Sequence, residues 1–386
     1  MAEVDVRRSE PAVAPPATLE ELELRDPYRE WLAREGVEVI TDHAFGDLLA
    51  VELGPWPRKG GRGAVVNLAG ETLLTDAHLV EIAPAGRSEP EHHLYEELVY
   101  VLAGHGETTI WSGNRRARVE WGAGALFPIP LNAWYEHRNL SGTEPLRYLA
   151  VTNAPPMMRL LADDDAVFDC PLAFPGRYEI DPDFYSAGGR LYAPRVWRSN
   201  FVPDAPAADV YAWKERGGGG ANVLLEMGGN TSLKPHISEF PVGTYKKAHR
   251  HGPGYHLVIL GGHGFSLLWT APDMSDLEKR DWSKNSMVII PSHACFHQHF
   301  NTGTARARYL AIRPGNMGTT APPSYRRPDA QVSIQEGGWQ IEYEDEARQV
   351  HELFEAELAR RGAPCRMRAF VPWCTGEVGP TDERDT

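Results

Sequence analysis

Four histidines occur in two closely spaced pairs in the second half of the chain. His249 and His251 form one His-x-His pair, and His297 and His299 form the other. Side chains two residues apart in a β-strand point to the same face, so each pair can present two imidazoles together. Imidazole nitrogens suit divalent iron, zinc, copper and nickel, and three of them leave coordination positions open. The apolar flanks LVIL and VIIP make an unbound histidine cluster costly. The pattern therefore predicts a metal site, with a hydrogen-bonded pair of core histidines as the alternative.

Two blocks of sequence occur twice in the chain. The first copy of one block begins at Ala77 and the second at Pro235, and they align without a gap at an offset of 158 residues. The other block covers residues 119–139 and 280–301, with one residue of slippage. Such internal repeats indicate two copies of one structural unit. The histidine pairs lie in the second copy, so we expect that copy to carry the metal.

Short apolar runs alternate with glycine, proline and asparagine from about residue 45. Runs such as HLVEIAPAG and RYLAVTN are typical of strands in an antiparallel all-β domain. A helix is expected over about 19–35, where Thr18 and Glu21 have capping-box spacing. A second helix is expected in EDEARQVHELFEAELARRG, with Gly362 at its end. The predicted division is a disordered N-terminus (1–18), a first β domain with its leading helix (19–155), a connection ending in a flexible GGGG loop (156–220), a second, metal-binding β domain (221–320) and a tail with a helix (321–386).

Composition argues against several classes of function. The chain of 386 residues has a formal net charge of −14, whereas binding to nucleic acid needs clustered Lys and Arg. The sequence contains no run of about 18 apolar residues that would suggest a membrane span, and its first residues lack the apolar segment of a signal peptide. The four cysteines form no Cys-x-x-Cys pair. We therefore expect a cytoplasmic protein without nucleic-acid or membrane partners.

The two histidine blocks resemble the two motifs of the cupin superfamily. The first motif of that family has a glycine, an HxH pair, a glutamate and a closing glycine, and the second has a proline, a histidine and an asparagine. The resemblance is to the two-domain form and covers about residues 50–315. It implies an all-β fold of two tandem cupin barrels (double-stranded β-helix, or jelly roll) with short flanking helices. The matching residues of the second repeat are Gly243, His249, His251, Gly262, Pro291, His297 and Asn301.

Two departures from the general cupin pattern point to a subgroup. Tyr255 stands where the family has glutamate, and the proline-to-histidine spacing of the second motif is one residue longer. Both features, with the aromatic-His-x-His-x-Asn run at 296–301, resemble gentisate 1,2-dioxygenase and its relatives, which bind Fe(II) with three histidines. The resemblance implies the metal ligands His249, His251 and His297 and the catalytic residues His299 and Gln298.

The implied reaction is cleavage by O2 of a hydroxylated aromatic acid, as in aromatic catabolism, or of another small molecule with adjacent oxygen donors. Fe(II) is the expected cofactor, and Zn, Ni, Mn and Cu are the alternatives. In a regular strand, Arg250 and Lys246 would point away from the face that carries the histidines. The candidates for substrate contact are Arg250, His256, Trp269 and Phe296, and further cations that could hold a carboxylate are Lys246, Lys247 and Arg308.

The first repeat has lost much of the metal motif. Glu91 and Tyr135 stand where the second repeat has its first and third ligand histidines. The first barrel is then expected to pack and to bury Tyr135, or alternatively to hold a metal on a different set of residues. The candidates for that set are His93, Glu97 and His137. The histidines that recur in both repeats are expected to serve packing or turns, and they are His78, His105, His236 and His263.

Two other classes of function stay open on the sequence. One is a non-oxidative, metal-dependent cupin enzyme such as a diketone hydrolase, an isomerase or a decarboxylase, which would not need O2. The other is a non-catalytic bicupin that binds a small molecule. In each case the family suggests a homodimer or a homotetramer.

Overall fold

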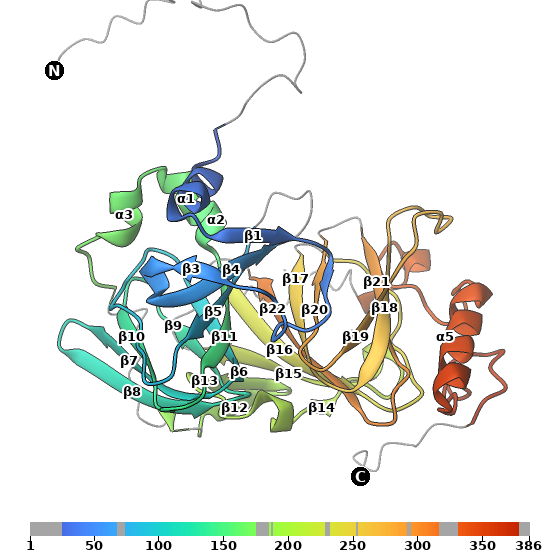
Figure 1. Cartoon of the computed structure of the whole chain (residues 1–386). Helices are drawn as coiled ribbons and strands as arrows, with labels where there is room; N and C mark the ends of the chain where they lie inside the picture. Colours follow the sequence, from blue (N-terminus) through green and yellow to red (C-terminus); the bar gives the residue numbers. More distant parts are fainter. Residues whose placement is uncertain are drawn as a thin grey trace, which may run out of the picture.

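Two β-barrels lie side by side in the computed structural model, with helices α1 to α3 beside the first barrel and α5 on the outer side of the second (Figure 1). The predicted disordered segment, 1–18, lies outside the described residues. The residues that the structure describes are 25–67, 74–174, 185–186, 188–227, 232–251, 254–291, 295–315 and 331–377.

The first barrel consists of two sheets that share one core. The larger sheet has the order β1-β4-β5-β11-β6-β9, with β3 beside β4, and the smaller has the order β10-β7-β8. Val99 of the larger sheet and Ile110 and Tyr135 of the smaller belong to the same apolar cluster. The strands are β1 (Glu38–Thr41), β3 (Gly54–Trp56), β4 (Gly61–Asn67), β5 (Asp76–Ile82), β6 (Glu97–Ala103), β7 (His105–Ser112), β8 (Arg115–Gly122), β9 (Leu126–Ile129), β10 (Trp134–Asn139) and β11 (Leu146–Thr152).

The second barrel repeats this arrangement and adds β12 and β2 at the two ends of its larger sheet. Its larger sheet has the order β12-β13-β15-β16-β22-β17-β20-β2, with β14 beside β15, and its smaller sheet has the order β19-β18-β21. The predicted all-β architecture of two repeated barrels is therefore confirmed. The strands are β2 (Ala44–Phe45), β12 (Arg190–Ala193), β13 (Val196–Ser199), β14 (Tyr211–Ala212), β15 (Ala221–Met227), β16 (Leu233–Phe240), β17 (Tyr255–Gly261), β18 (His263–Trp269), β19 (Glu278–Ser283), β20 (Met287–Ile290), β21 (Phe296–Asn301) and β22 (Ala307–Pro314).

Each repeat contributes a short segment to the sheet of the other barrel. Strand β2 lies between β1 and β3 of the first barrel in sequence but pairs antiparallel with β20 of the second. In the same way Val202, which lies between β13 and β14 of the second barrel in sequence, pairs with Leu126 on β9 through hydrogen bonds of 2.8 and 2.9 Å. Leu98 and Ile312, from different barrels, also lie in one apolar cluster. The two barrels thus share backbone pairing and core.

The helices flank the barrels. Helix α1 begins at Pro27 because Asp26 caps it and accepts a 3.1 Å hydrogen bond from Tyr28 N. Arg25 and Asp26 are not helical, so α1 is not the continuous helix expected over 19–35, and the expected cap at Thr18 lies outside the described residues. The predicted tail helix and its glycine stop at Gly362 are confirmed. The helices are α1 (Pro27–Glu35), α2 (Ala154–Leu161), α3 (Asp164–Phe168) and α5 (Arg348–Arg361).

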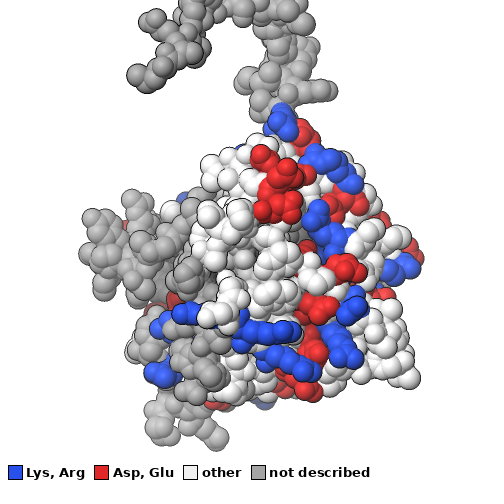
Figure 2. Space-filling view, turned by 90° about the vertical axis from the view of Figure 1, so that its left-hand side faces the viewer, with Lys and Arg blue, Asp and Glu red and all other residues white. Residues whose placement is uncertain are grey.

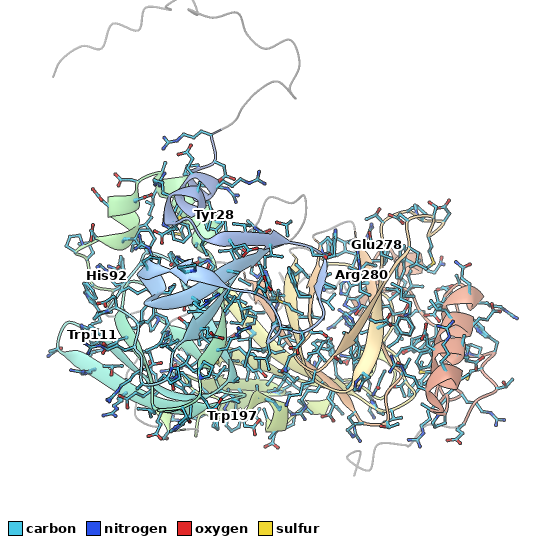
Figure 3. All side chains as sticks on the ribbon, in the orientation of Figure 1. Tyr28, His92, Trp111, Trp197, Glu278 and Arg280 are labelled. Atoms are coloured by element: carbon cyan, nitrogen blue, oxygen red, sulfur yellow. The ribbon has the colours of Figure 1, made fainter. Side chains whose placement is uncertain are left out.

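Helix α1 is tied to the first barrel by a buried polar contact. Side chains fill the space between the sheets (Figure 3), and Tyr28 projects from α1 toward the barrel below it. Its hydroxyl donates a 2.6 Å hydrogen bond to Asp76 on β5. Burial raises the pKa of the Asp76 carboxyl to about 7. His78, two residues further along β5, is buried next to Trp31 and Trp56, which suits the packing role expected of it.

The glycine run at 217–220 is packed, although the sequence suggested a flexible loop. Gly217 and Gly218 have φ angles of +68° and +61°, in the left-handed region. A Cβ at Gly218 would overlap the carbonyl oxygen of Tyr245, and one at Gly217 would meet the Tyr343 side chain. The prediction of a flexible loop is therefore wrong, since these glycines let the chain approach the second barrel closely.

Charges of both signs are mixed on the surface. Basic and acidic side chains lie next to one another on the face of the molecule drawn in Figure 2. Ion pairs on the first barrel include Arg87 with Glu136, 3.7 Å apart, and Arg118 with Glu107. Across the described residues, the structure contains no helix with the length and apolarity that a bilayer crossing needs.

Candidate metal centre in the second barrel

Three histidines converge inside the second barrel. His249 and His251 lie in the segment between β16 and β17, and His297 lies on β21. His249 and His297 form an isolated bridge in which each backbone N–H donates to the other's carbonyl, at 3.1 and 2.9 Å. Their ring centroids are 4.3 Å apart, and His251 lies 4.6 Å from His297. One ligand nitrogen from each of the three lies within 4.8 Å of the others. The three predicted ligands therefore form one cluster.

The triad has the protonation state that metal ligands need. Burial lowers the pKa of His249 and His251 well below 6.5 and that of His297 to about 3, so that the imidazoles are neutral. Nδ1 of His249 donates to Lys247 O at 3.1 Å, which leaves Nε2 as the ligand atom. Neither ring nitrogen of buried His251 has a hydrogen-bond partner among the described residues. Because an unpartnered buried imidazole is costly, this donor set fits a divalent cation.

The triad opens onto a cavity of ≈ 50 Å³. This volume exceeds what one water molecule needs, but it is well below the roughly 300–1,000 Å³ that is usual for drug-sized ligands. The cavity therefore suits a small molecule. Its lining consists of the triad with Trp213, Arg216, His236, Lys246, Tyr255, Leu257, His299, Tyr309 and Ala311.

Two buried cations face this cavity. Arg216 donates a 2.9 Å hydrogen bond from Nη1 to Gln340 Oε1, and burial lowers its pKa to about 10. Lys246 donates from Nζ to Tyr309 Oη at 3.1 Å, and burial lowers its pKa as well. Lys246 lines the cavity and does not point away from the histidines as predicted, because residues 241–248 form turns and bridges rather than a regular strand. A small anion would find two positive groups beside the triad.

His299 and Gln298 lie on opposite faces of β21. His299 lines the cavity, and its Nδ1 lies 2.8 Å from Ser266 Oγ. Gln298 points outward, where its amide donates to Lys246 O at 2.9 Å and to Glu346 Oε2 at 2.6 Å. The expected catalytic role of Gln298 therefore has no support in this geometry, since its side chain supports the strand from outside.

The four expected substrate contacts do not line the cavity. Trp269 and Phe296 stack on each other at 5.6 Å, and the Arg250 guanidinium lies over the Phe296 ring at 5.0 Å. Nδ1 of His256 lies 3.4 Å from Thr75 Oγ1, at the contact with the first barrel. The other two cations proposed for a carboxylate are engaged in ion pairs away from the cavity, Lys247 with Glu342 and Arg308 with Glu239.

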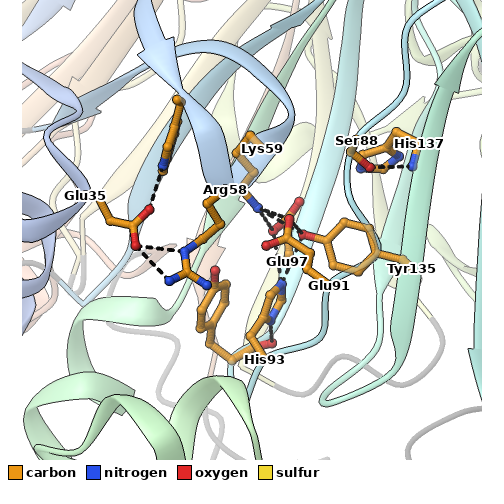
Figure 4. A network of polar contacts seen from close by, with 11 residues as sticks. Glu35, Arg58, Lys59, Ser88, Glu91, His93, Glu97, Tyr135 and His137 are labelled. Atoms are coloured by element: carbon orange, nitrogen blue, oxygen red, sulfur yellow. Dashed lines mark hydrogen bonds and ion pairs between the residues drawn. The ribbon is translucent and has the colours of Figure 1, made fainter.

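A lysine ammonium lies beside the residues of the first barrel that correspond to His249 and His297. Glu91 and Tyr135 form the backbone bridge that matches the one between His249 and His297. Lys59 Nζ lies 2.6 Å from Glu91 Oε1 and 2.9 Å from Tyr135 Oη (Figure 4). Glu97 Oε2 lies 3.9 Å from Lys59 Nζ, and the Lys59 charge helps to hold the pKa of that carboxyl well below its usual range despite burial.

The three residues considered for a first-barrel metal do not form a close ligand set. His93 Nε2 lies 3.4 Å from Glu97 Oε2, but Nδ1 of His137 is 2.7 Å from Thr108 Oγ1. Burial lowers the pKa of His137 to about 4. In the described residues, no set that combines His93, Glu97 and His137 brings three ligand atoms within 4.8 Å of one another. The ammonium of Lys59 supplies positive charge there instead.

A repeated five-residue signature marks the buried cations. Trp56 to Gly60 reads WPRKG, and Trp213 to Gly217 reads WKERG, so both repeats have a tryptophan, then a cation, then a glycine at the same spacing. The cations are Lys59 and Arg216. A comparison of the repeats upstream of Ala77 would therefore have identified Arg216. His236 was expected to serve packing but lines the cavity.

Comparisons with known proteins give one family match and several similar structures. Residues 78–152 match the family described as the cupin domain. No curated protein sequence matches the chain. The oxalate decarboxylase of Lactobacillus farciminis, in a formate complex, is 12% identical with a TM-score of 0.49, and the match covers 77% of this chain and 95% of that one. A variant of the Bacillus subtilis oxalate decarboxylase is 12% identical with a TM-score of 0.46, and the match covers 77% of this chain and 85% of that one. The hazelnut (Corylus avellana) vicilin is 12% identical with a TM-score of 0.48, and the match covers 70% of this chain and 86% of that one.

The match covers residues 78–152 of the first barrel, and the second barrel repeats the strand order of the first, so the chain folds as two tandem barrels of the cupin (jelly-roll) type. The predicted resemblance to the cupin superfamily is confirmed at this level. Identities of 12% and TM-scores below 0.5 say nothing about activity, metal or substrate. The narrower resemblance to gentisate dioxygenases stays a prediction.

Proposed function

We propose that the second barrel is the active site of a mononuclear, non-haem Fe(II) dioxygenase that acts on a small anionic substrate with adjacent oxygen donors. The observation that carries the proposal is a buried triad of neutral histidines that shares one cavity with two buried cations. A hydroxylated aromatic acid and a dicarbonyl acid both have the required chemistry.

The triad would hold the metal through one nitrogen of each imidazole. A divalent iron on three imidazoles has open positions, where it supplies Lewis-acid and redox chemistry to a chelating substrate and O2. The hydrogen bond between His249 and Lys247 O supports this reading, because it fixes the ring and its tautomer before any metal binds. The backbone bridge between His249 and His297 holds the two rings at a constant separation.

Substrate binding is assigned to Arg216 and Lys246. Charge-assisted hydrogen bonds from a guanidinium or an ammonium are about twice as strong as neutral ones, and burial strengthens them further. Arg216 is 5% exposed and Lys246 is 1% exposed. They would orient the carboxylate of the substrate so that its remaining oxygen donors face the triad, which lowers the entropic cost of reaction.

His299 is assigned the role of moving a proton. Its Nδ1 is bonded to Ser266 Oγ, so Nε2 is the nitrogen that can face the cavity. A neutral imidazole at this place can accept the proton of a substrate hydroxyl as the substrate binds. Tyr309, which also lines the cavity, keeps the Lys246 ammonium in place beside it.

A non-oxidative reaction at the same centre is the second candidate. The cavity of ≈ 50 Å³ favours it, because an aromatic acid fills more space than a short dicarboxylate or diketone. Hydrolysis, isomerisation and decarboxylation would use the same ligands and the same cations but would consume no O2. The two candidates therefore differ in a directly measurable co-substrate.

O2 uptake by the protein loaded anaerobically with Fe(II) tests the proposal. Hydroxybenzoates, catechols, diketones and short dicarboxylates form the substrate panel. The proposal expects uptake that depends on one of these compounds. Turnover of a panel compound without O2 uptake would replace the dioxygenase with the non-oxidative enzyme.

Paired lysine variants test the assignment of the cavity cations. Lys246→Met is expected to raise KM at least about tenfold, the loss of one charge-assisted contact, while the metal content stays unchanged. Lys247→Met is the matched control, because Lys247 is adjacent in sequence but pairs with Glu342 outside the cavity. Equal KM values for the two variants would contradict the assignment.

A further inference from the structure

A second cluster of ligand-type side chains lies far from the histidine triad in sequence, on α5 and the segment that follows it. His351 and Glu355 are one helical turn apart on α5, and Cys365 and Cys374 come after its end. One ligand atom from each of the four lies within 4.8 Å of the others. His351 is 3% exposed and Cys374 is 7% exposed. The cluster is therefore partly sealed from solvent by the protein.

The spacing of these atoms is that of ligands around one tetrahedral ion. The two cysteine sulfurs are 3.6 Å apart, and two thiolates on one zinc at about 2.3 Å each would be separated by about 3.8 Å. His351 Nε2 and Glu355 Oε1 are 3.2 Å apart, and a nitrogen and an oxygen on the same zinc would be about 3.4 Å apart. Both separations agree with a common centre.

The groups around the cluster are arranged as supports for metal ligands. His351 Nδ1 lies 3.1 Å from Tyr245 Oη, whose own proton goes to Glu346 Oε1 at 2.6 Å. Nδ1 of His351 therefore donates, and Nε2 keeps its lone pair. That nitrogen is buried and has no hydrogen bond of acceptable geometry among the described residues. Gly376 N donates to Cys374 Sγ at 3.3 Å, as backbone amides do toward ligating thiolates.

We propose that His351, Glu355, Cys365 and Cys374 form a structural zinc site that fastens the C-terminal segment to the second barrel. Two sulfurs, one imidazole and one carboxylate suit Zn²⁺ in a closed four-coordinate site. None of the four lines the cavity of the triad, so this site is independent of the proposed reaction.

A short series of contacts connects the proposed zinc site to β21, the strand that carries His297 and His299. Tyr245 bonds to Glu346, and Glu346 accepts a 2.6 Å hydrogen bond from Gln298 on β21. Gln298 lies between His297 and His299 in sequence. Zinc binding would therefore hold α5 and the outer support of β21 in place, which is a structural effect on the triad rather than a catalytic one.

Cobalt substitution in the full chain tests the site, because Co²⁺ bound to thiolates absorbs in the near ultraviolet and Co²⁺ bound to imidazoles alone does not. The protein is stripped with a chelator under reducing conditions and titrated with Co²⁺. We expect the thiolate absorption to saturate near one equivalent in the wild type and to persist in His251→Ala, which lacks the triad. Cys365→Ser/Cys374→Ser is expected to abolish it.

Matched variants keep the test decisive. Cys170→Ser/Cys295→Ser removes the other two cysteines and is expected to leave the absorption unchanged. If the Cys365→Ser/Cys374→Ser chain does not fold, His351→Gln serves instead, with an expected loss of Co²⁺ affinity of at least about tenfold. Absence of thiolate absorption in the reduced wild type, or its survival in both the cysteine pair and the His351 variants, would overturn the proposal.

Discussion

Lys59 and Arg216 occupy equivalent positions of the two repeats, yet their surroundings differ. Lys59 is enclosed by Glu91, Glu97 and the Tyr135 hydroxyl, so its charge is neutralised inside the protein. Arg216 lies beside neutral histidines, and it bonds to the amide oxygen of Gln340. The same backbone position thus gives an internal ion pair in one barrel and a charge that faces a cavity in the other.

Removal of the Lys59 charge is expected to destabilise the first barrel. Lys59→Met leaves two buried carboxylates without their counter-charge, and breaking a buried pair in this way costs about 3–5 kcal/mol. The loss should be smaller at pH 4, because without the Lys59 charge the pKa of buried Glu97 is no longer held down and its carboxylate can take up a proton. Chemical denaturation at both pH values measures the effect.

Lys234→Met is the control for that substitution. Lys234 pairs with Glu226 at 2.7 Å, but the lysine side chain is 25% exposed and the glutamate is 34% exposed. Such a pair contributes roughly 0–1 kcal/mol. A Lys59 variant no less stable than the Lys234 variant would mean that the Lys59 cluster is not a neutralised ion pair.

Asp76 predicts a pH dependence of stability with a definite sign. Its pKa is about 7 in the folded protein and about 4 in an unfolded chain. Between these values the folded protein retains a proton that the unfolded chain releases, so this group makes stability fall as the pH rises from about 4 to 7. The asparagine side chain of the Asp76→Asn variant does not titrate. The stability of the variant relative to the wild type should therefore increase across that interval, by on the order of 2–4 kcal/mol.

Calorimetry of both proteins at pH 4.5 and pH 8 measures this difference. The oxygen of the asparagine amide can still accept the hydrogen bond from Tyr28. Other titrating groups, such as His78, whose pKa is lowered to about 3 by burial, are common to both proteins and largely cancel. A stability difference that is the same at both pH values would show that Asp76 titrates normally.

The direction of a side chain was predicted correctly where side chains alternate between two faces, as in a strand, and wrongly where the chain turns. The His-x-His spacing identified the triad, because His297 and His299 lie on β21 and His249 forms a backbone bridge with His297. The same rule assigned Lys246 to the wrong face, since the chain turns there. Arg216 was missed because its signature lies outside the two repeated blocks that were compared. The hydrogen bond between Glu346 and Gln298 joins segments that are far apart in sequence, so no local pattern predicts it.

At the scale of elements, substitution within the glycine run at 217–220 is expected to lower the stability of the protein. Gly218→Ala would introduce a Cβ that overlaps Tyr245 O, at a φ angle of +61°. The backbone of Tyr245 and the adjacent Lys246 must then shift, at a cost of about 1–3 kcal/mol beyond the strain of the φ angle itself. Thermal unfolding is the measurement.

Gly113→Ala is the control that separates the effect of the overlap with Tyr245 O from the effect of the positive φ angle. Gly113 has a φ angle of +58°, and nothing lies within 4 Å of a Cβ built there. Both variants therefore carry the left-handed strain, and only one carries the overlap. Equal losses of stability for the two variants would indicate that the glycine run is not closely packed.

Element prediction was strongest for long strands that are buried almost throughout and weakest in the connection. The runs HLVEIAPAG and RYLAVTN became β5 and β11, which pair with each other over their whole length. Strands β12 to β14 have between two and four residues each, too few for a periodic pattern to emerge. Their pairing is determined by the edge of the second sheet, which is a tertiary effect.

At the scale of the whole molecule, the exchange of short strands makes the barrels interdependent. Strand β2 completes the second barrel and Val202 the first, and one apolar cluster spans both. Metal-free protein is therefore expected to unfold in a single calorimetric transition. Two well-separated transitions would show that the barrels are independent domains. The internal repeat predicted two barrels, but neither block of it contains the exchanged segments.

The iron content of the wild type and of His251→Ala, after anaerobic loading with Fe(II) and gel filtration, tests the central claim most directly. His263→Ala is the control, since His263 is exposed at the start of β18 and lies outside the cavity. We predict one iron per chain in the wild type and in His263→Ala, and almost none in His251→Ala. Equal iron in all three proteins, or none in the wild type, would contradict a metal centre on His249, His251 and His297.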